Sequence, residues 1–166
     1  WYDEIIEESA LAETDLRDVR FLVNHNTDMI PLARSRNNTE NSTMQMVVVR
    51  EGMDIRVDLD TENNAEAKSL YSAVSRGDIS GMSFMFTVDE DSWDDLESDH
   101  PTRTIRKIGK VFEVSAVTFP AYEATSIQAR GLSDALDSAR ASLDSVLAER
   151  REVERKKQKI RILAEV

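Results

Sequence analysis

The segment from Gly77 to Phe86 constrains the fold most, because it places small residues in a strand that is otherwise built from bulky apolar ones. Alternate side chains of a strand share one face, and here that face is aromatic and apolar: Met82, Phe84, Phe86 and Val88. We expect it to pack in the core. Ser83 then points away from the core, whereas Ser80 shares the aromatic face. A β-bulge at Gly81 would reverse the two assignments.

The remaining segments up to residue 130 predict an α+β body, with strands that alternate and one amphipathic helix. We expect strands over Asp18–His25, Met44–Arg50, Met53–Asp60, Arg103–Lys107 and Lys110–Phe119, and a helix over Glu62–Arg76 that ends at Gly77. The second and third strands form a β-hairpin. The acidic stretch Asp89–Asp99 reads as an exposed loop. A calcium site there is disfavoured, because the stretch has no glycine at a central turn.

Residues 131–166 contain no Gly beyond Gly131 and no Pro, and apolar residues recur there at nearly heptad spacing. This pattern predicts a long amphipathic helix, which packs on its own body or on a second copy. We therefore divide the chain into a body, 1–130, and a helical tail, 131–166.

Charge separates the same two parts of the chain. The net charge is −11, yet residues 150–161 carry +5 and the remainder −16. An acidic body repels phosphate groups, so we expect no specific nucleic acid as a partner. The basic end of the tail has two interpretations, a solvated helix face, which is the commoner case, and a docking segment. No apolar run is long enough to span a bilayer, and we expect an intracellular protein with no membrane partner.

The chain has no cysteine, which excludes a thiolate nucleophile and leaves Ser, His, Asp or Glu to carry the chemistry. A serine hydroxyl needs a neutral imidazole to accept its proton, and the chain has two histidines. His100 lies in the acidic stretch, whereas His25 ends an apolar strand, where geometry is easier to maintain. Glu113 lies inside an apolar strand and needs a partner there. The pattern alone leaves two partners open for it, a structural arginine and a catalytic histidine.

Three segments, taken in this order, resemble one known family. They are Val-Asn-His at 23–25, Ser-Gly-Met-Ser-Phe at 80–84 and Glu-Val-Ser-Ala-Val-Thr-Phe-Pro-Ala-Tyr at 113–122. The chain resembles the prohead (procapsid maturation) proteases of tailed bacteriophages, relatives of the herpesvirus protease assemblin. The resemblance covers about residues 17–130. Met85 departs from it, because the family has glycine between the two phenylalanines.

The resemblance implies a fold and a site. The fold is a small closed antiparallel β-barrel with surrounding helices, to which the long C-terminal amphipathic helix is added. The site is a triad of Ser83 as nucleophile, His25 as base and Glu113 as its carboxylate partner. In assemblin the third member is a second histidine, so the glutamate follows the phage pattern. No cofactor or metal is implied.

The resemblance also implies a biological role, which is proteolysis inside the assembling prohead in the host cytoplasm. Such enzymes cleave scaffold segments or the delta domain of the major capsid protein, and often themselves. We expect a homodimer or higher oligomer, with the tail as a scaffold-like or oligomerisation segment. The alternative is a non-enzymatic capsid scaffold or assembly protein that retains the protease-like barrel.

Overall fold

The computed structural model describes residues 2–50, 52–121 and 125–129, and the first compact unit of the chain ends at Gln128. Its elements in chain order are β1 (Asp3–Ile6), η1 (Glu8–Leu11), β2 (Arg20–Val23), β3 (Ala33–Arg34), η2 (Arg36–Asn38), β4 (Met44–Val49), β5 (Gly52–Val57), α1 (Ala65–Arg76), β6 (Gly81–Asp94) and β7 (Thr102–Val117). The predicted tail, 131–166, lies outside the described residues.

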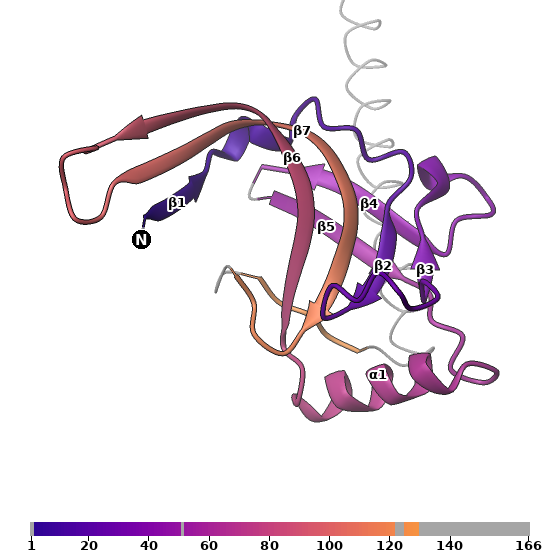
Figure 1. Cartoon of the computed structure of the whole chain (residues 1–166). Helices are drawn as coiled ribbons and strands as arrows, with labels where there is room; N and C mark the ends of the chain where they lie inside the picture. Colours follow the sequence, from indigo (N-terminus) through magenta and orange to yellow (C-terminus); the bar gives the residue numbers. More distant parts are fainter. Residues whose placement is uncertain (1, 51, 122–124, 130–166) are drawn as a thin grey trace, which may run out of the picture. The chain divides into compact units, whose positions relative to one another are not determined.

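The long strand β7 organises the sheet (Figure 1). Along one of its edges β6 pairs antiparallel with it over nearly its whole length. Along the other edge β1 pairs in parallel with the beginning of β7 and β2 pairs in parallel with its end. A single bridge between Asp15 and Lys110 occupies the space between them. β3 then adds to β2, which completes a five-stranded mixed sheet.

The prediction of a closed antiparallel barrel is wrong for the described residues. In the described residues the sheet is mixed and open, and β4 and β5 form a separate two-stranded sheet. Side chains attach this hairpin to the main sheet. The Asn38 amide donates to the Met46 carbonyl at 2.9 Å and accepts the Met46 N–H at 3.1 Å. Thr43 exchanges bonds with the Arg34 backbone in a similar way.

The helix and the hairpin confirm their sequence patterns. Asn64 caps α1 by accepting the N–H groups of Glu66 and Ala67, and Gly77 ends it in the left-handed conformation, with φ of 79°. The hairpin connects Val49 to Gly52 as expected. It turns Met44 and Met46 inward, whereas Val47 is 58% exposed.

Two predictions about β6 and β7 are wrong. The acidic stretch is not a loop from its start, because β6 continues to Asp94, and the two strands predicted around Ile108 and Gly109 are one strand. Arg103 explains the first difference. Its guanidinium bonds to Asp91 at 2.7 Å and to Glu4 at 3.0 Å, and it lies 5.9 Å from the ring centre of Trp93. Cross-strand partners of opposite charge make an acidic strand stable.

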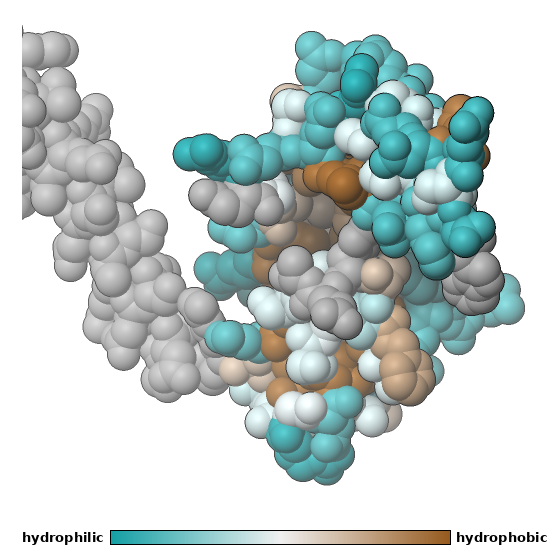
Figure 2. Space-filling model, turned by 90° about the vertical axis from the view of Figure 1, so that its left-hand side faces the viewer, coloured by the Kyte–Doolittle hydropathy of each residue, from teal (hydrophilic) through white to brown (hydrophobic). Residues whose placement is uncertain are grey.

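The core is centred on β7, with contributions from β2, the hairpin and α1. Its largest fully buried side chains come from different elements: Val19, Phe21, Met44, Ile105, Ile108, Val111 and Val114. The aromatic face of β6 does not form its centre, because Phe84 and Phe86 are only half-buried, with ring centres 4.8 Å apart. Apolar side chains also reach the surface, and in Figure 2 they gather in the middle of one face between hydrophilic residues.

No helix among the described residues is long and apolar enough to cross a membrane.

Candidate active site

Three neighbouring strands bring the predicted site residues to one part of the sheet. β7 lies in the middle and carries Glu113 and Ser115, β6 carries Ser83, and β2 leads to His25. Ser83 lies directly opposite Ser115, which lies opposite Leu22 on the other side. Residues that face each other across strands share one face of the sheet, so Ser83, Ser115 and Glu113 lie on the same face.

His25 is placed by an unusual end to β2. Both Asn24 and His25 have positive φ, at 50° and 55°, which turns the chain sharply after Val23. Asparagine tolerates this conformation better than most residues. The Asn24 N–H donates to the Ala116 carbonyl at 2.9 Å, and its side-chain oxygen accepts the Thr118 N–H at 2.9 Å. The turn is thereby fixed to the end of β7.

Glu113 contacts the imidazole of His25 directly. The distance from His25 Nδ1 to Glu113 Oε1 is 2.5 Å, and the carboxylate side chain is only 3% exposed. An ionised carboxylate only accepts hydrogen bonds, so Nδ1 carries the proton and Nε2 of the neutral ring is left as an acceptor. The imidazole is 36% exposed, so it borders solvent. Of the two partners left open for Glu113, the structure shows the histidine. Arg20, opposite Glu113 on β2, bonds to Asp18 instead.

Ser115 completes the surroundings of the carboxylate. Its hydroxyl donates to Glu113 Oε2 at 2.5 Å and accepts the backbone N–H of His25 at 3.1 Å. Ser115 is fully buried. The sequence pattern assigned no role to this residue. The spacing of two residues from Glu113 is the signal that could have suggested one.

Ser83 is 6% exposed and stands in the most regular part of the β6–β7 ladder. The pairing runs without irregularity from Gly81 to Met85, so Gly81 carries no bulge. Ser80 precedes the strand and is exposed. Within the described part of the chain the Ser83 hydroxyl makes no hydrogen bond, to His25 or to any other residue. Catalytic hydrogen bonds are often long in free enzymes and shorten when substrate binds.

A bulge follows directly after the site residues. Met85 lies opposite Glu113 and Phe86 lies opposite Val111, so Phe112 is an extra residue on β7. Val111 consequently joins the face of Phe84 and Phe86, although strict alternation along β7 would put it on the face of Glu113. Met85, the departure from the family pattern, is 43% exposed and shares the face of Ser83.

Residues after β7 cover the outer edge of β6 beside Ser83. The Thr125 hydroxyl accepts the Met82 N–H at 3.0 Å and donates to the Met82 carbonyl at 2.6 Å. The Ile127 N–H donates to the Ser80 carbonyl at 3.1 Å. Pro120 packs against Gly81 so closely that a Cβ there would lie 2.7 Å from the proline ring. These contacts fix the backbone that leads into Ser83.

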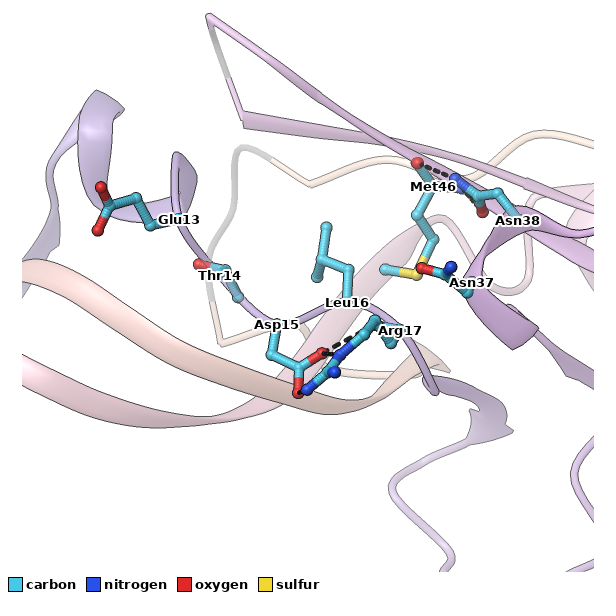
Figure 3. A pocket seen from close by; sticks show the side chains of 8 residues that line it. All are labelled: Glu13, Thr14, Asp15, Leu16, Arg17, Asn37, Asn38 and Met46. Atoms are coloured by element: carbon cyan, nitrogen blue, oxygen red, sulfur yellow. Dashed lines mark hydrogen bonds and ion pairs between the residues drawn. The ribbon is translucent and has the colours of Figure 1, made fainter.

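A hollow of about 440 Å³ lies elsewhere, between the segment before β2 and η2 (Figure 3). It is lined by Glu13, Thr14, Asp15, Leu16, Arg17, Asn37, Asn38 and Met46, and the ion pair of Asp15 with Arg17 lies on its wall. The Arg17 guanidinium holds the pKa of Asp15 far below its usual range. None of the predicted site residues lines this hollow. Among the described residues no group of three or more His, Asp or Glu side chains is arranged to hold a metal ion.

A family model described as caudovirus prohead serine protease matches residues 1–138. The chain belongs to this family. Membership identifies the protein as a serine protease of phage capsid maturation, with the assembling prohead as its location and capsid protein as its class of substrate. The comparisons with curated proteins and with solved structures found no match.

Proposed function

We propose that this prohead protease cleaves peptide bonds with Ser83 as nucleophile, His25 as general base and Glu113 as the carboxylate that orients the imidazole. The observation that carries the proposal is the contact of 2.5 Å between His25 Nδ1 and the buried Glu113 carboxylate, on the face of the sheet that Ser83 shares. A buried carboxylate bound to Nδ1 fixes the tautomer in which Nε2 accepts a proton.

In the first step, His25 Nε2 takes the proton from Ser83 Oγ while that oxygen attacks the carbonyl carbon of the scissile bond. Glu113 stabilises the imidazolium that forms. The imidazolium then gives its proton to the leaving amine, and the peptide bond breaks. A water molecule, deprotonated by His25, hydrolyses the acyl-enzyme and restores the Ser83 hydroxyl. Each step uses groups of this chain and water only.

The substrates that we propose are the scaffold or the delta domain of the major capsid protein, together with the protease itself. Family membership supports the class of substrate, and the three segments of the resemblance support the choice within it. We further propose that a homodimer or higher oligomer is the active form, since activity before assembly would destroy the scaffold.

Labelling with a fluorophosphonate, followed by peptide mapping, tests the site. The protein is labelled at low and high concentration, with and without capsid protein, beside Ser83→Ala, His25→Ala and the exposed control Ser80→Ala. We expect the label on Ser83, lost in the first two variants and retained in the third. A label on Ser80 or Ser115 would contradict the assignment. No label under any condition would favour a non-enzymatic scaffold or assembly protein.

A further inference from the structure

We infer that Ser115 is a positioning residue of the protease, which holds Glu113 and the backbone of His25 in the geometry that the reaction needs. The inference rests on the proposed function, because it assigns Ser115 an effect on His25 and Glu113 and no contact with substrate. It adds a fourth side chain to the site.

The hydrogen bonds of Ser115 determine which way its hydroxyl points. The proton of the hydroxyl is directed at Glu113 Oε2, at 2.5 Å, and the oxygen accepts the His25 N–H at 3.1 Å. Glu113 thus has one oxygen on the imidazole and the other on Ser115. A carboxylate held at both oxygens cannot rotate away from the imidazole, and each bond to a charged group is stronger than a neutral one.

The bond to the His25 N–H matters for a separate reason. His25 has φ of 55°, a conformation that non-glycine residues rarely adopt and that neighbouring contacts must maintain. Ser115 accepts the N–H of this same residue, so one hydroxyl connects the backbone that carries the base to the carboxylate that orients it.

Ser115 is not suited to be the nucleophile. It has no exposed surface, and its proton is already directed at Glu113. Ser83, by contrast, has a hydroxyl that bonds to none of the described residues, and it keeps a small exposed area. The two serines lie opposite each other on neighbouring strands. Their hydrogen-bond partners, and not their positions in the sheet, give them different roles.

The chain supplies a matched control in Ser35. Like Ser115 it is fully buried, accepts a backbone N–H, from Val19 at 2.9 Å, and donates its proton, here to the Leu16 carbonyl at 3.1 Å. It contacts neither His25 nor Glu113. Ser35→Ala therefore measures what the loss of such a serine does to the fold alone.

The test compares fluorophosphonate labelling of Ser83 in the wild-type protein, Ser115→Ala and Ser35→Ala, with melting temperatures recorded for all three. We expect Ser115→Ala to lower the maximal labelling rate roughly 10- to 150-fold, the loss of one hydrogen bond to a charged group, with little change in the half-saturating probe concentration. Ser35→Ala should melt at a lower temperature and label at the wild-type rate. Equal rates in the two variants would overturn the inference.

A second comparison separates a positioning role from general loosening. In a Glu113→Ala background, Ser115→Ala should cost much less than it does alone, because the bond through which it acts is gone. An unchanged factor would overturn the inference. If Ser115→Ala does not fold, Ser115→Thr replaces it in the test, because threonine keeps the hydroxyl. A folded Ser115→Thr variant in which Ser83 is not labelled would also overturn the inference. An unlabelled Ser83 in the wild-type protein would instead contradict the proposed function.

Discussion

The two residues after β2 have a strained backbone conformation that places the imidazole of His25 beside Glu113. Asn24 and His25 are two successive left-handed residues, and His25 costs about 1–2 kcal/mol relative to an extended backbone, whereas Asn24 costs less. Four hydrogen bonds to β7 and the residue after it offset this cost: to the Ala116 carbonyl, the Thr118 N–H, Ser115 Oγ and the Glu113 carboxylate. The cost lies at the candidate base, as is common for residues whose position a reaction requires.

Asp18 provides a test of electrostatics near the same strand. Its bond to the Arg34 guanidinium, at 2.6 Å, lowers the pKa of the Asp18 carboxyl in the folded protein. A lowered folded pKa gives stability that is complete above the unfolded pKa and is lost as pH falls through the folded one. Because Asp18 is 39% exposed, we expect Asp18→Asn to lower the free energy of unfolding by about 1 kcal/mol or less at neutral pH.

Thermal unfolding of Asp18→Asn and of the wild-type protein, at neutral pH and at about pH 2, checks this expectation. The difference in melting temperature should disappear in acid. Asp58→Asn is the control, since that carboxylate is 62% exposed and lies 3.4 Å from Arg56. A difference for Asp18→Asn that persists at low pH would show that the loss is one of packing.

At the residue scale, the sequence indicates which side chains need a partner and does not indicate which partner each one has. His25 was preferred over His100 from its place at the end of an apolar strand, and the need of Glu113 for a partner followed from its apolar surroundings. The sequence could not choose between an arginine and a histidine for that partner. The choice depends on the parallel register of β2 on β7, which joins residues 88 positions apart and leaves no local pattern.

At the scale of elements, β6 and β7 form one long curved pair whose irregularities are concentrated at a few positions. Register shifts occur between Met85 and Phe86 and at three places between Thr87 and Asp91, and the ladder is regular on the Ser83 side. Bulges increase the twist and bend of a strand. The pair therefore bends beyond the site. The part that carries Ser83 and Glu113 keeps a regular pairing register.

Two glycines of this pair make a matched test of backbone approach. A Cβ at Gly81 would lie 2.7 Å from the Pro120 ring, and one at Gly109 would lie 2.2 Å from the Asp89 carboxylate. A ring closed onto the backbone moves little, whereas the exposed Asp89 side chain can rotate away. We expect Gly81→Ala to lower the melting temperature and slow Ser83 labelling, and Gly109→Ala to change both less. Equal effects, measured by calorimetry and labelling, would contradict this.

Local signals predicted the elements that local contacts form. The helix over 65–76 and the hairpin of β4 with β5 depend on neighbours in sequence, a cap at Asn64 and a tight connection after Val49. The acidic end of β6 was misread because its composition is that of a loop. Its stability comes from the ion pair of Asp91 with Arg103, which lies on β7. The residues of β6 alone do not show that this partner exists.

At the scale of the molecule, the sheet stays open although the family resemblance implies a closed barrel. β3 has only two residues, and the described residues show no ladder between β3 and the hairpin of β4 and β5. Ladder hydrogen bonds would be needed to close the sheet. Whether a sheet closes depends on such long-range pairings, which the residue pattern does not contain.

The tail gives a prediction for the whole protein in its capsid. We expect deletion of residues 132–166 to prevent packaging into proheads, because the apolar stripe and the basic end are suited to binding a scaffold or a second copy. Counting protease molecules in purified proheads by quantitative mass spectrometry checks this. The control replaces the cluster of Lys and Arg at 155–157 alone. Unchanged packaging of the deletion variant would contradict the role of the tail.

The position of β7 in the chain has a consequence for synthesis. Among the described residues it is the last strand, and β1, β2 and β6 all pair with it. As the chain leaves the ribosome, the earlier strands emerge without the one against which they pair, and contacts between distant segments form late. His25 thus stays separated from Glu113 until β7 has emerged. The candidate site is therefore not assembled on the growing polypeptide before β7 emerges, and we expect no proteolysis by the nascent chain up to that point.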